Sequence, residues 1–411
     1  MKKPFFRNAL TIHLAIVLAA LVLSSAVPGQ PPDTYTADRQ RAVSLVNNGK
    51  YEEALPLLEK LSADKRADAD VFLGLGLSYF KAALGIDDPA QAKPLRLKAR
   101  NALVKARELG ISIPEIDLLI ASIKPDGGDP SRSDNPQARE SMSAADKYFA
   151  AGDYQNAVKA YEKAATLDPT IYEAALYTGN TYYALKDYEK AGVWFAKAIA
   201  IDPDRETAHR YWADGLANSG RDKEAIDKYL DAILAEPYSS AAWRGLMQYA
   251  SANNIALAHA KIDVPVDFKK GEQGNTQITL GSGSLDGKDD GSFAWMSYGI
   301  TRATWQTDKD GKLSDQFKKA YPNERAYRHS LAEEAAALRM VATLAREKKV
   351  KEPSPALAML QRIETAGLLE AFILFARSDA EVRRDYPAYR SANRDKLRLY
   401  LTEYVKKNGG K

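Results

Sequence analysis

The sequence of 411 residues contains no cysteine. This absence excludes disulfide bonds, thiol catalysis, cysteine metal sites and the lipidated cysteine of a bacterial lipoprotein. Histidine is scarce as well, with four in the chain. The sequence also has no nucleophile elbow, no phosphate-binding loop and no second histidine at the spacing of a zinc protease. We therefore expect no cofactor and no metal, and no enzyme activity outside the C-terminal part, which is considered below.

A strong charge of one sign is also missing. The formal net charge is +4, and Lys2, Lys3 and Arg7 lie in a segment that we expect to be removed, which leaves +1 (4 − 3). A basic patch large enough for a nucleic acid needs a much greater excess of Lys and Arg. The charge therefore predicts no nucleic-acid partner.

The first 26 residues have the pattern of a secretory signal. A basic start precedes an apolar run from Ala9 to Leu23, and Ser24-Ser25-Ala26 follows. The run is shorter than the roughly 20 residues that a membrane-spanning helix needs. We expect a signal peptide over residues 1–26, cleaved after Ala26, and no membrane span in the remaining chain. The protein should then lie in the periplasm or be secreted, and an uncleaved N-terminal membrane anchor is the alternative.

Between residues 138 and 237 the chain repeats itself three times with a step of 34 residues (188 − 154). The equivalent positions hold Tyr154, Tyr188 and Asp222; Ala157, Ala191 and Ala225; Tyr161, Phe195 and Tyr229; Ala164, Ala198 and Ala232; and Pro169, Pro203 and Pro237. This period, with small residues, an aromatic residue and a closing proline, resembles the tetratricopeptide repeat (TPR) family. The resemblance implies a superhelix of helix–turn–helix units whose concave surface binds another polypeptide.

The pattern predicts a mainly α fold with several parts. Residues 34–123 form an N-terminal TPR-like block with an inserted loop of about eleven residues from Leu84 to Pro94, which interrupts the repeat template. Residues 124–137 are a linker rich in proline, glycine and serine. Residues 138–260 form the main TPR block of three repeats and a capping helix. Residues 261–411 form a separate C-terminal domain of no recognised family, with a strand over 275–280 and helices near 293–305, 327–346, 354–376 and 379–406.

The resemblance also implies which side chains face a ligand, because in this family they come from four positions of the first helix of each repeat. In this sequence those positions hold Arg139, Met142, Asp146, Phe149, Glu173, Leu176, Asn180, Tyr183, Thr207, Arg210, Asp214 and Ala217. Apolar anchors beside Asn180 and Arg210 suit an extended or helical peptide. Met142 and Asp146 stand where carboxylate-clamping relatives need lysine and asparagine, so we do not expect that specificity. The alternative is that some of these residues pack against the C-terminal domain.

The C-terminal part contains three further patterns. His329 precedes Glu333 and Glu334, and such a pair can bind a metal or relay a proton, although a surface interaction is the simpler interpretation. The segment Asp308–Asp315 resembles the middle of a calcium loop but has Phe317 where the final carboxylate belongs, so we expect a polar turn. Trp295, Tyr298 and Trp305 share a helix face, which indicates core packing or a carbohydrate or peptide platform.

Two hypotheses follow. The first is a non-enzymatic exported adaptor or scaffold of a bacterial envelope that binds a partner protein or peptide in the concave groove. The second places an enzyme or a glycan-binding module in the C-terminal domain, with the repeats as a targeting arm. A deep polar cleft around His329, Glu333 and Trp305 would favour the second hypothesis, and a filled core the first.

Overall fold

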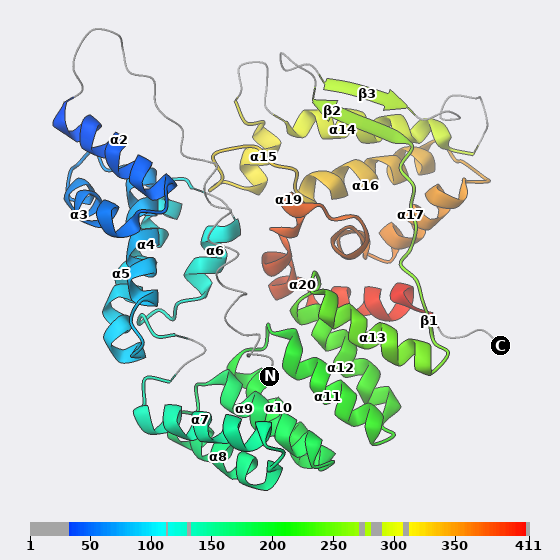
Figure 1. Ribbon diagram of the computed structural model, residues 1–411. Coiled ribbons are helices and arrows are strands. Elements are labelled where there is room, and N and C mark those ends of the chain that lie inside the picture. Colours follow the sequence, from blue (N-terminus) through cyan, green and yellow to red (C-terminus); the bar gives the residue numbers. More distant parts are fainter. Residues whose placement is uncertain are drawn as a thin grey trace. The chain divides into compact units, whose positions relative to one another are not determined.

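The computed structural model describes residues 33–111, 114–129, 133–270, 276–280, 290–306 and 312–407. The described chain is mainly α-helical, as predicted (Figure 1). It divides into two compact units, residues 1–181 and 182–411, with the division inside helix α9 (Tyr172–Ala184), and each unit is described by itself. The predicted signal peptide, residues 1–26, lies outside the described residues. Among the described helices, none has the length and apolar character of a membrane span.

The first unit begins with helical hairpins. Its helices are α2 (Thr34–Asn47), α3 (Tyr51–Ser62), α4 (Ala69–Leu84), α5 (Pro89–Glu108) and α6 (Pro114–Ala121). Asp33 and Asp68 start α2 and α4, because each side chain accepts a hydrogen bond from a backbone N–H of the first turn. Apolar residues of α2 to α6 form one buried cluster around Leu58 and Leu103.

The predicted inserted loop is wrong. Residues 85–88 separate α4 from α5, and the extra residues instead lengthen α5 to 20 residues. Asp88 caps α5 through a hydrogen bond of 3.0 Å from the Ala90 N–H, and Pro89 occupies the first turn, where its missing N–H is not needed. Pro94 lies inside the helix. The repeat pattern resumed late because the second helix of this repeat is long.

The rest of the first unit contains α7 (Pro136–Ala150), α8 (Tyr154–Leu167) and the start of α9. Gly152 joins α7 to α8 with a φ of 77°, a conformation that favours glycine. Part of the predicted linker is anchored on α5, because Arg96 donates a 2.8 Å hydrogen bond to the Gly127 carbonyl and Lys93 pairs with Asp126 at 2.8 Å.

The second unit contains the later repeats and the C-terminal helices. The repeat helices are α10 (Tyr188–Ile201), α11 (Glu206–Asn218), α12 (Asp222–Ala235) and α13 (Ser240–Ala252). The C-terminal helices are η4 (Ser292–Trp295), α14 (Met296–Trp305), α15 (Asp315–Ala320), α16 (Leu331–Glu347), α17 (Pro355–Thr365), α18 (Leu369–Phe372), η5 (Ile373–Arg377), α19 (Ala380–Arg383), α20 (Tyr386–Tyr400) and η6 (Leu401–Val405).

Two short antiparallel pairs complete the second unit. Strand β1 (Ala256–Leu257) pairs with β4 (Lys406–Lys407), and β2 (Val266–Lys270) pairs with β3 (Thr276–Leu280). The predicted strand over 275–280 is confirmed by β3, whereas β2 was not predicted. The predicted helix over 354–376 is broken, because Gly367 has a φ of 69° and ends the first part.

One hydrophobic core contains residues of α11, α12 and α13 together with residues of the C-terminal helices. Helix α20 lies against α12: the Tyr386 hydroxyl donates to the Leu234 carbonyl at 2.8 Å, and Arg390 donates to the Ala235 carbonyl at 2.7 Å. Arg398 adds an ion pair with Asp231 at 2.7 Å. The core therefore continues across residue 261, which the sequence suggested as a domain boundary, and the last repeat and the C-terminal helices pack as one body.

Close packing of α4 on α5 gives a stability prediction. A Cβ atom on Gly76 would lie 2.6 Å from Leu103 Cγ and 3.1 Å from the Leu103 backbone N, and Leu103 is fully buried. We expect Gly76→Ala to lower the free energy of unfolding by about 1 kcal/mol or more, although alanine favours helix, because overpacking outweighs propensity. Chemical denaturation measures this. Gly85→Ala is the control, since its nearest neighbour would be 3.4 Å away, and equal stability of the two variants would contradict the prediction.

Candidate functional site

The predicted groove residues of the first unit differ in accessibility. Phe149 is 38% exposed and lies against the Tyr154 ring, with centroids 5.2 Å apart. Leu176 is 4% exposed and offers almost no surface to a partner. Met142 packs against the apolar clusters around Tyr161 and Ile171. Glu173 and Asn180 are half-buried, and Arg139 donates to the Ser133 and Asp134 carbonyls at 3.0 and 3.1 Å. Phe149 is thus the predicted apolar anchor of this unit with the most exposed surface.

The predicted residues of the second unit form a connected surface on α9 and α11. The Tyr183 hydroxyl accepts a 2.8 Å hydrogen bond from Asn218, and its ring lies 5.5 Å from that of Tyr188. Burial raises the pKa of Tyr183, and the charge of Asp214 adds to the effect. Arg210 pairs with Glu206 at 2.7 Å. Thr207 and Ala217 are half-buried.

Arg210 also fills the space beside α13. A Cβ atom on Gly245 would lie 2.8 Å from Arg210 Cδ, so the aliphatic part of the arginine runs along the surface of that glycine. The guanidinium lies 4.6 Å from the centre of the Tyr211 ring. The ion pair and these contacts hold Arg210 in one orientation, as a binding surface requires.

Asp146 and Asp214 have a role that the sequence analysis missed. Each accepts a hydrogen bond from a tyrosine 15 residues later in the second helix of its hairpin: Tyr161 at 2.6 Å and Tyr229 at 2.5 Å. The equivalent positions of the repeat between them hold Asn180 and Phe195. Across these three repeats the carboxylate occurs where a phenol can donate to it. In the sequence this pairing is visible only when two positions 15 residues apart are compared together, and not from the groove positions alone.

This pairing gives a second prediction. Burial raises the pKa of Asp214, and the Tyr229 hydrogen bond opposes the rise, so Tyr229→Phe removes a donor from a partly desolvated carboxylate. We expect a loss of about 1 to 3 kcal/mol in the free energy of unfolding. The double variant Asp214→Asn/Tyr229→Phe, which copies the middle repeat, should recover most of it. Denaturation of the single and double variants forms a double-mutant cycle, and purely additive effects would contradict the pairing.

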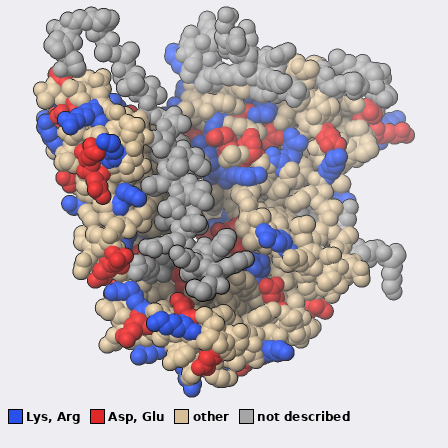
Figure 2. Space-filling view, in the orientation of Figure 1, with Lys and Arg blue, Asp and Glu red and all other residues tan. Residues whose placement is uncertain are grey.

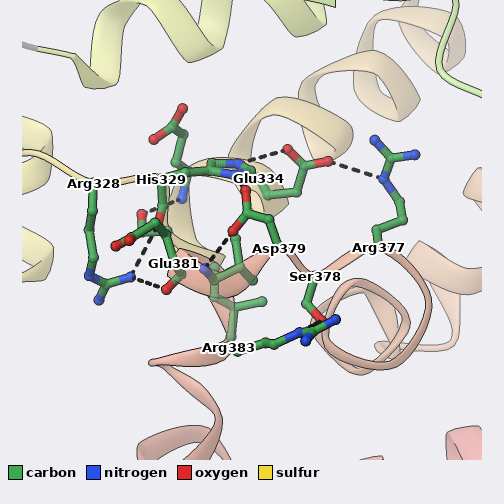
Figure 3. Close-up of polar contacts among 12 residues, drawn as sticks. Arg328, His329, Glu334, Arg377, Ser378, Asp379, Glu381 and Arg383 are labelled. Atoms are coloured by element: carbon green, nitrogen blue, oxygen red, sulfur yellow. Dashed lines mark hydrogen bonds and ion pairs between the residues drawn. The ribbon is translucent and has the colours of Figure 1, made fainter. Parts of the chain in front are cut away.

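A buried cluster of charges lies at the start of α16 (Figure 3), and its partners come from α14 and from the segment 377–379. Glu334 is 2% exposed and accepts hydrogen bonds from the Tyr298 hydroxyl at 2.7 Å and from Arg377 Nε at 3.2 Å. His329 Nε2 lies 3.2 Å from Glu334 Oε2, and His329 Nδ1 lies 2.6 Å from Asp379 Oδ2. Figure 3 shows the imidazole between these two carboxylates. His329 therefore links α16 to the segment that follows η5.

Glu333 is buried beside this cluster with partners of its own. It is 0% exposed and pairs with Arg302 at 2.9 Å, and the Tyr327 hydroxyl lies 2.9 and 3.0 Å from its two oxygens. The predicted pairing of His329 with Glu333 one helical turn later is replaced by contacts with Glu334 and Asp379. The reason is that α16 begins at Leu331, so His329 lies outside the helix and helical spacing does not apply to it.

A second buried ion pair holds the same region. Arg328 pairs with Asp385 at 2.5 Å and with Glu324 at 2.8 Å, and Asp385 also accepts the Leu331 N–H at 2.7 Å. Asp385 thereby satisfies a backbone donor in the first turn of α16. These contacts join α16 to the segment between α19 and α20.

The cluster is a filled polar core. Both oxygens of Glu333 and both oxygens of Glu334 accept hydrogen bonds. Trp295 and Tyr298 are 2% and 3% exposed, which confirms core packing for these two aromatic residues. In the described part of the chain no group of three His, Cys, Asp or Glu is placed to hold a metal ion. The surroundings of Glu333 are therefore a packed core of paired charges.

The charges set the protonation states in the cluster. Burial alone would raise the pKa of Glu334, but the His329 hydrogen bond and the charges of Arg377 and Arg302 outweigh it and hold the pKa at about 2. Burial opposes protonation of His329, and its contacts with Glu334 and Asp379 outweigh that effect, so its pKa lies above the ordinary value of 6.5. Asp379 has a lowered pKa, because its hydrogen bonds to His329 and the Val382 N–H outweigh desolvation.

A pH prediction follows. Because the folded-state pKa of His329 is raised, the stabilisation from its charge is complete below the ordinary pKa of 6.5 and is lost as the pH rises through the raised value. We expect the difference in unfolding free energy between wild type and His329→Gln to be greater near pH 6 than near pH 9. Thermal melts in both buffers measure it.

His209 supplies a control of opposite sign. Burial lowers its pKa, so its contribution to stability is complete above the ordinary value of 6.5 and is lost as the pH falls from that value through the lowered one. His209→Gln should therefore reduce stability less near pH 6 than near pH 9. If the two variants showed the same dependence on pH, the assignment of the charged state to His329 would be wrong.

Comparison with known proteins identifies the hairpins. Residues 39–84 and 142–206 match the family model of the tetratricopeptide repeat. These hairpins are tetratricopeptide repeats. The TPR resemblance noted in the sequence is thus confirmed, and the C-terminal part from about residue 261 matches no recognised family. TPR arrays are interaction modules whose concave surfaces bind other polypeptides.

Three solved structures are similar to parts of this chain. The first TPR of Spaghetti (RPAP3), bound to an HSP90 peptide, is 22% identical, covering 29% of this chain and 94% of that one, with a TM-score of 0.27. The TPR domain of Arabidopsis OM64 is 17% identical, covering 28% and 96%, with a TM-score of 0.27. MamA AMB-1 is 21% identical, covering 49% and 99%, with a TM-score of 0.24. No curated protein matches the chain.

Proposed function

We propose that this protein is an exported, non-enzymatic adaptor that binds a partner polypeptide on the concave face of its repeats. The observation that carries the proposal is the placement of the C-terminal helices. Their polar contacts reach α12 and the turn before α11, through Asp204, Asp231 and Leu234. Arg210 instead forms an ion pair with Glu206 of its own helix, and Asp214 accepts a hydrogen bond from Tyr229 of α12. The C-terminal helices therefore cover the second-helix side of the last repeat. In the described chain none of these polar contacts involves Arg210 or Asp214, which leaves these groove residues of α11 to a partner.

The surface charge supports a protein partner. On the face shown in Figure 2, Lys and Arg side chains are interspersed with Asp and Glu, and no broad area of the described surface has one sign. A nucleic-acid interface needs a continuous basic stripe. Mixed charges beside exposed apolar residues such as Phe149 are typical of protein interfaces.

Cross-linking tests the groove. A photoactivatable phenylalanine analogue at Thr207, a predicted concave position, should cross-link a partner in envelope extract, whereas the same group at Val193 should not. Val193 is 57% exposed on α10, the second helix of its hairpin. We also expect Tyr183→Ala to weaken binding of the captured partner by about 1 to 2 kcal/mol, since aromatic anchors carry much of the energy of an interface. Cross-linking at Val193 alone, or full affinity in Tyr183→Ala, would exclude this face.

The export signal gives a separate prediction. If residues 1–26 are removed, the mature protein begins at Val27 and fractionates with soluble envelope proteins. N-terminal sequencing of the purified protein measures this. Recovery of Met1 on a membrane-bound protein would support the uncleaved anchor instead.

A further inference from the structure

A cleft in the second unit belongs neither to the repeat groove nor to the buried charge cluster. Its volume is about 490 Å³. It lies between the turn before α13, α13 itself, the segment after β1, and the segment from η5 to α19. The residues that define it are Tyr238, Trp243, Met247, His259, Phe375 and Arg383.

Aromatic rings form the walls of the cleft in a fixed arrangement. The Trp243 ring meets the rings of His259 and Phe375 edge-on, at 5.1 and 6.4 Å between centroids. Phe375 stacks on Tyr400 at 5.6 Å. The Trp243 indole N–H donates to the Pro237 carbonyl at 2.7 Å, which fixes the orientation of the indole. A preformed aromatic wall binds an apolar side chain at little cost in conformational entropy.

The rim of the cleft exposes apolar surface. Met247 is 58% exposed and Tyr238 is 38% exposed. Methionine adapts its shape to different apolar ligands, and tyrosine combines an apolar ring with a polar end. The rim therefore resembles the edge of a binding site in composition.

The charge of the cleft is positive. The Arg383 guanidinium lies 4.6 Å from the centre of the Tyr238 ring, and its Nε lies 3.4 Å from Ser378 Oγ. Its neighbours Arg377 and Arg384 pair with carboxylates, whereas within the described chain no carboxylate pairs with Arg383. The lining includes no Asp or Glu. An apolar ligand that carries a carboxylate would complement both features.

The buried charge cluster holds one wall of the cleft. Figure 3 shows Arg377 and Asp379 turned toward Glu334 and His329, while Arg383 lies beside Ser378 on the other side of the same segment. Phe375 belongs to η5, a π-helix. Such segments are uncommon and recur at functional sites, because the wider turn re-aims side chains. Here the same segment presents Phe375 to the cleft and Arg377 to the buried Glu334.

We propose that this cleft is a second binding site, which takes an aromatic side chain of an acidic peptide segment. The aromatic side chain lies in the cleft against Trp243 and Phe375, and a neighbouring carboxylate pairs with Arg383. The site is separate from the concave face of the repeats, because Tyr183, Arg210 and Asp214 are absent from its lining.

The test uses blocked seven-residue peptides with the mature full-length protein. One peptide has a central phenylalanine between aspartate and glutamate, a second has lysines in place of the acids, and a third has serine in place of phenylalanine. Binding is followed through the indole N–H signals of the five tryptophans, with Trp243 assigned by Trp243→Phe. We expect the first peptide to shift the Trp243 signal, and the other two to bind about tenfold more weakly, since each lacks one of the two contacts.

Exposed residues supply the variants, so folding is preserved. Arg383→Gln and Met247→Ser should each weaken binding of the first peptide by a factor between about two and about ten. Two control variants lie elsewhere in the same unit. Lys348→Gln removes a similar charge and Met340→Ser removes a methionine that is 47% exposed, and both should leave binding of the first peptide unchanged. Tyr183→Ala should also leave it unchanged, which separates a failure of this site from a failure of the repeat groove.

Three results would overturn the proposal. The first is no shift of the Trp243 signal with any peptide at millimolar concentration. The second is equal binding of the acidic and basic peptides, or full affinity in Arg383→Gln. The third is a shift of the Trp243 signal with a chitin tetrasaccharide but not with peptides, which would make the cleft a carbohydrate site.

Discussion

The last turn of α12 sets the constraint on which the second unit depends. Its final carbonyls have no partners within the helix, and an array of repeats must cover its last apolar face. Helix α20 meets both demands, because Tyr386 and Arg390 donate to the Leu234 and Ala235 carbonyls while apolar residues of both helices enter one core. The C-terminal helices are therefore part of the repeat fold, and they end the array as a cap made of many helices.

Buried charge organises the remainder of that cap. Glu333 and Glu334 are taken out of water at the start of α16, and each unpaired buried carboxylate would cost several kcal/mol. The fold supplies partners from α14, from the segment before α16 and from the segment after η5. Because these partners come from separate stretches of the chain, the cluster fixes the relative positions of α14, α16 and the segment after η5.

Much of the repeat architecture could be predicted from the sequence, because period, small residues and closing prolines reflect local packing that recurs every 34 residues. The length of α5 could not, since Pro89 and Pro94 resemble loop residues until the cap at Asp88 is seen. The groove positions were assigned by family register, but Leu176 is buried and Asp146 faces Tyr161. The cluster around His329 could not be predicted from the sequence, because Asp379 and Arg377 join it only through tertiary packing.

The pairing of residues 15 positions apart also bears on how such an array evolves. Aspartate with tyrosine and asparagine with phenylalanine are two self-consistent solutions to one contact, and both occur in this chain. A change from the aspartate–tyrosine pair to the asparagine–phenylalanine pair takes two substitutions. After the first one, the hairpin has either a carboxylate without its donor or a phenol without its carboxylate acceptor. We therefore expect the two positions to be coupled, so that duplication of a whole hairpin preserves the pairing whereas a single change within one hairpin breaks it.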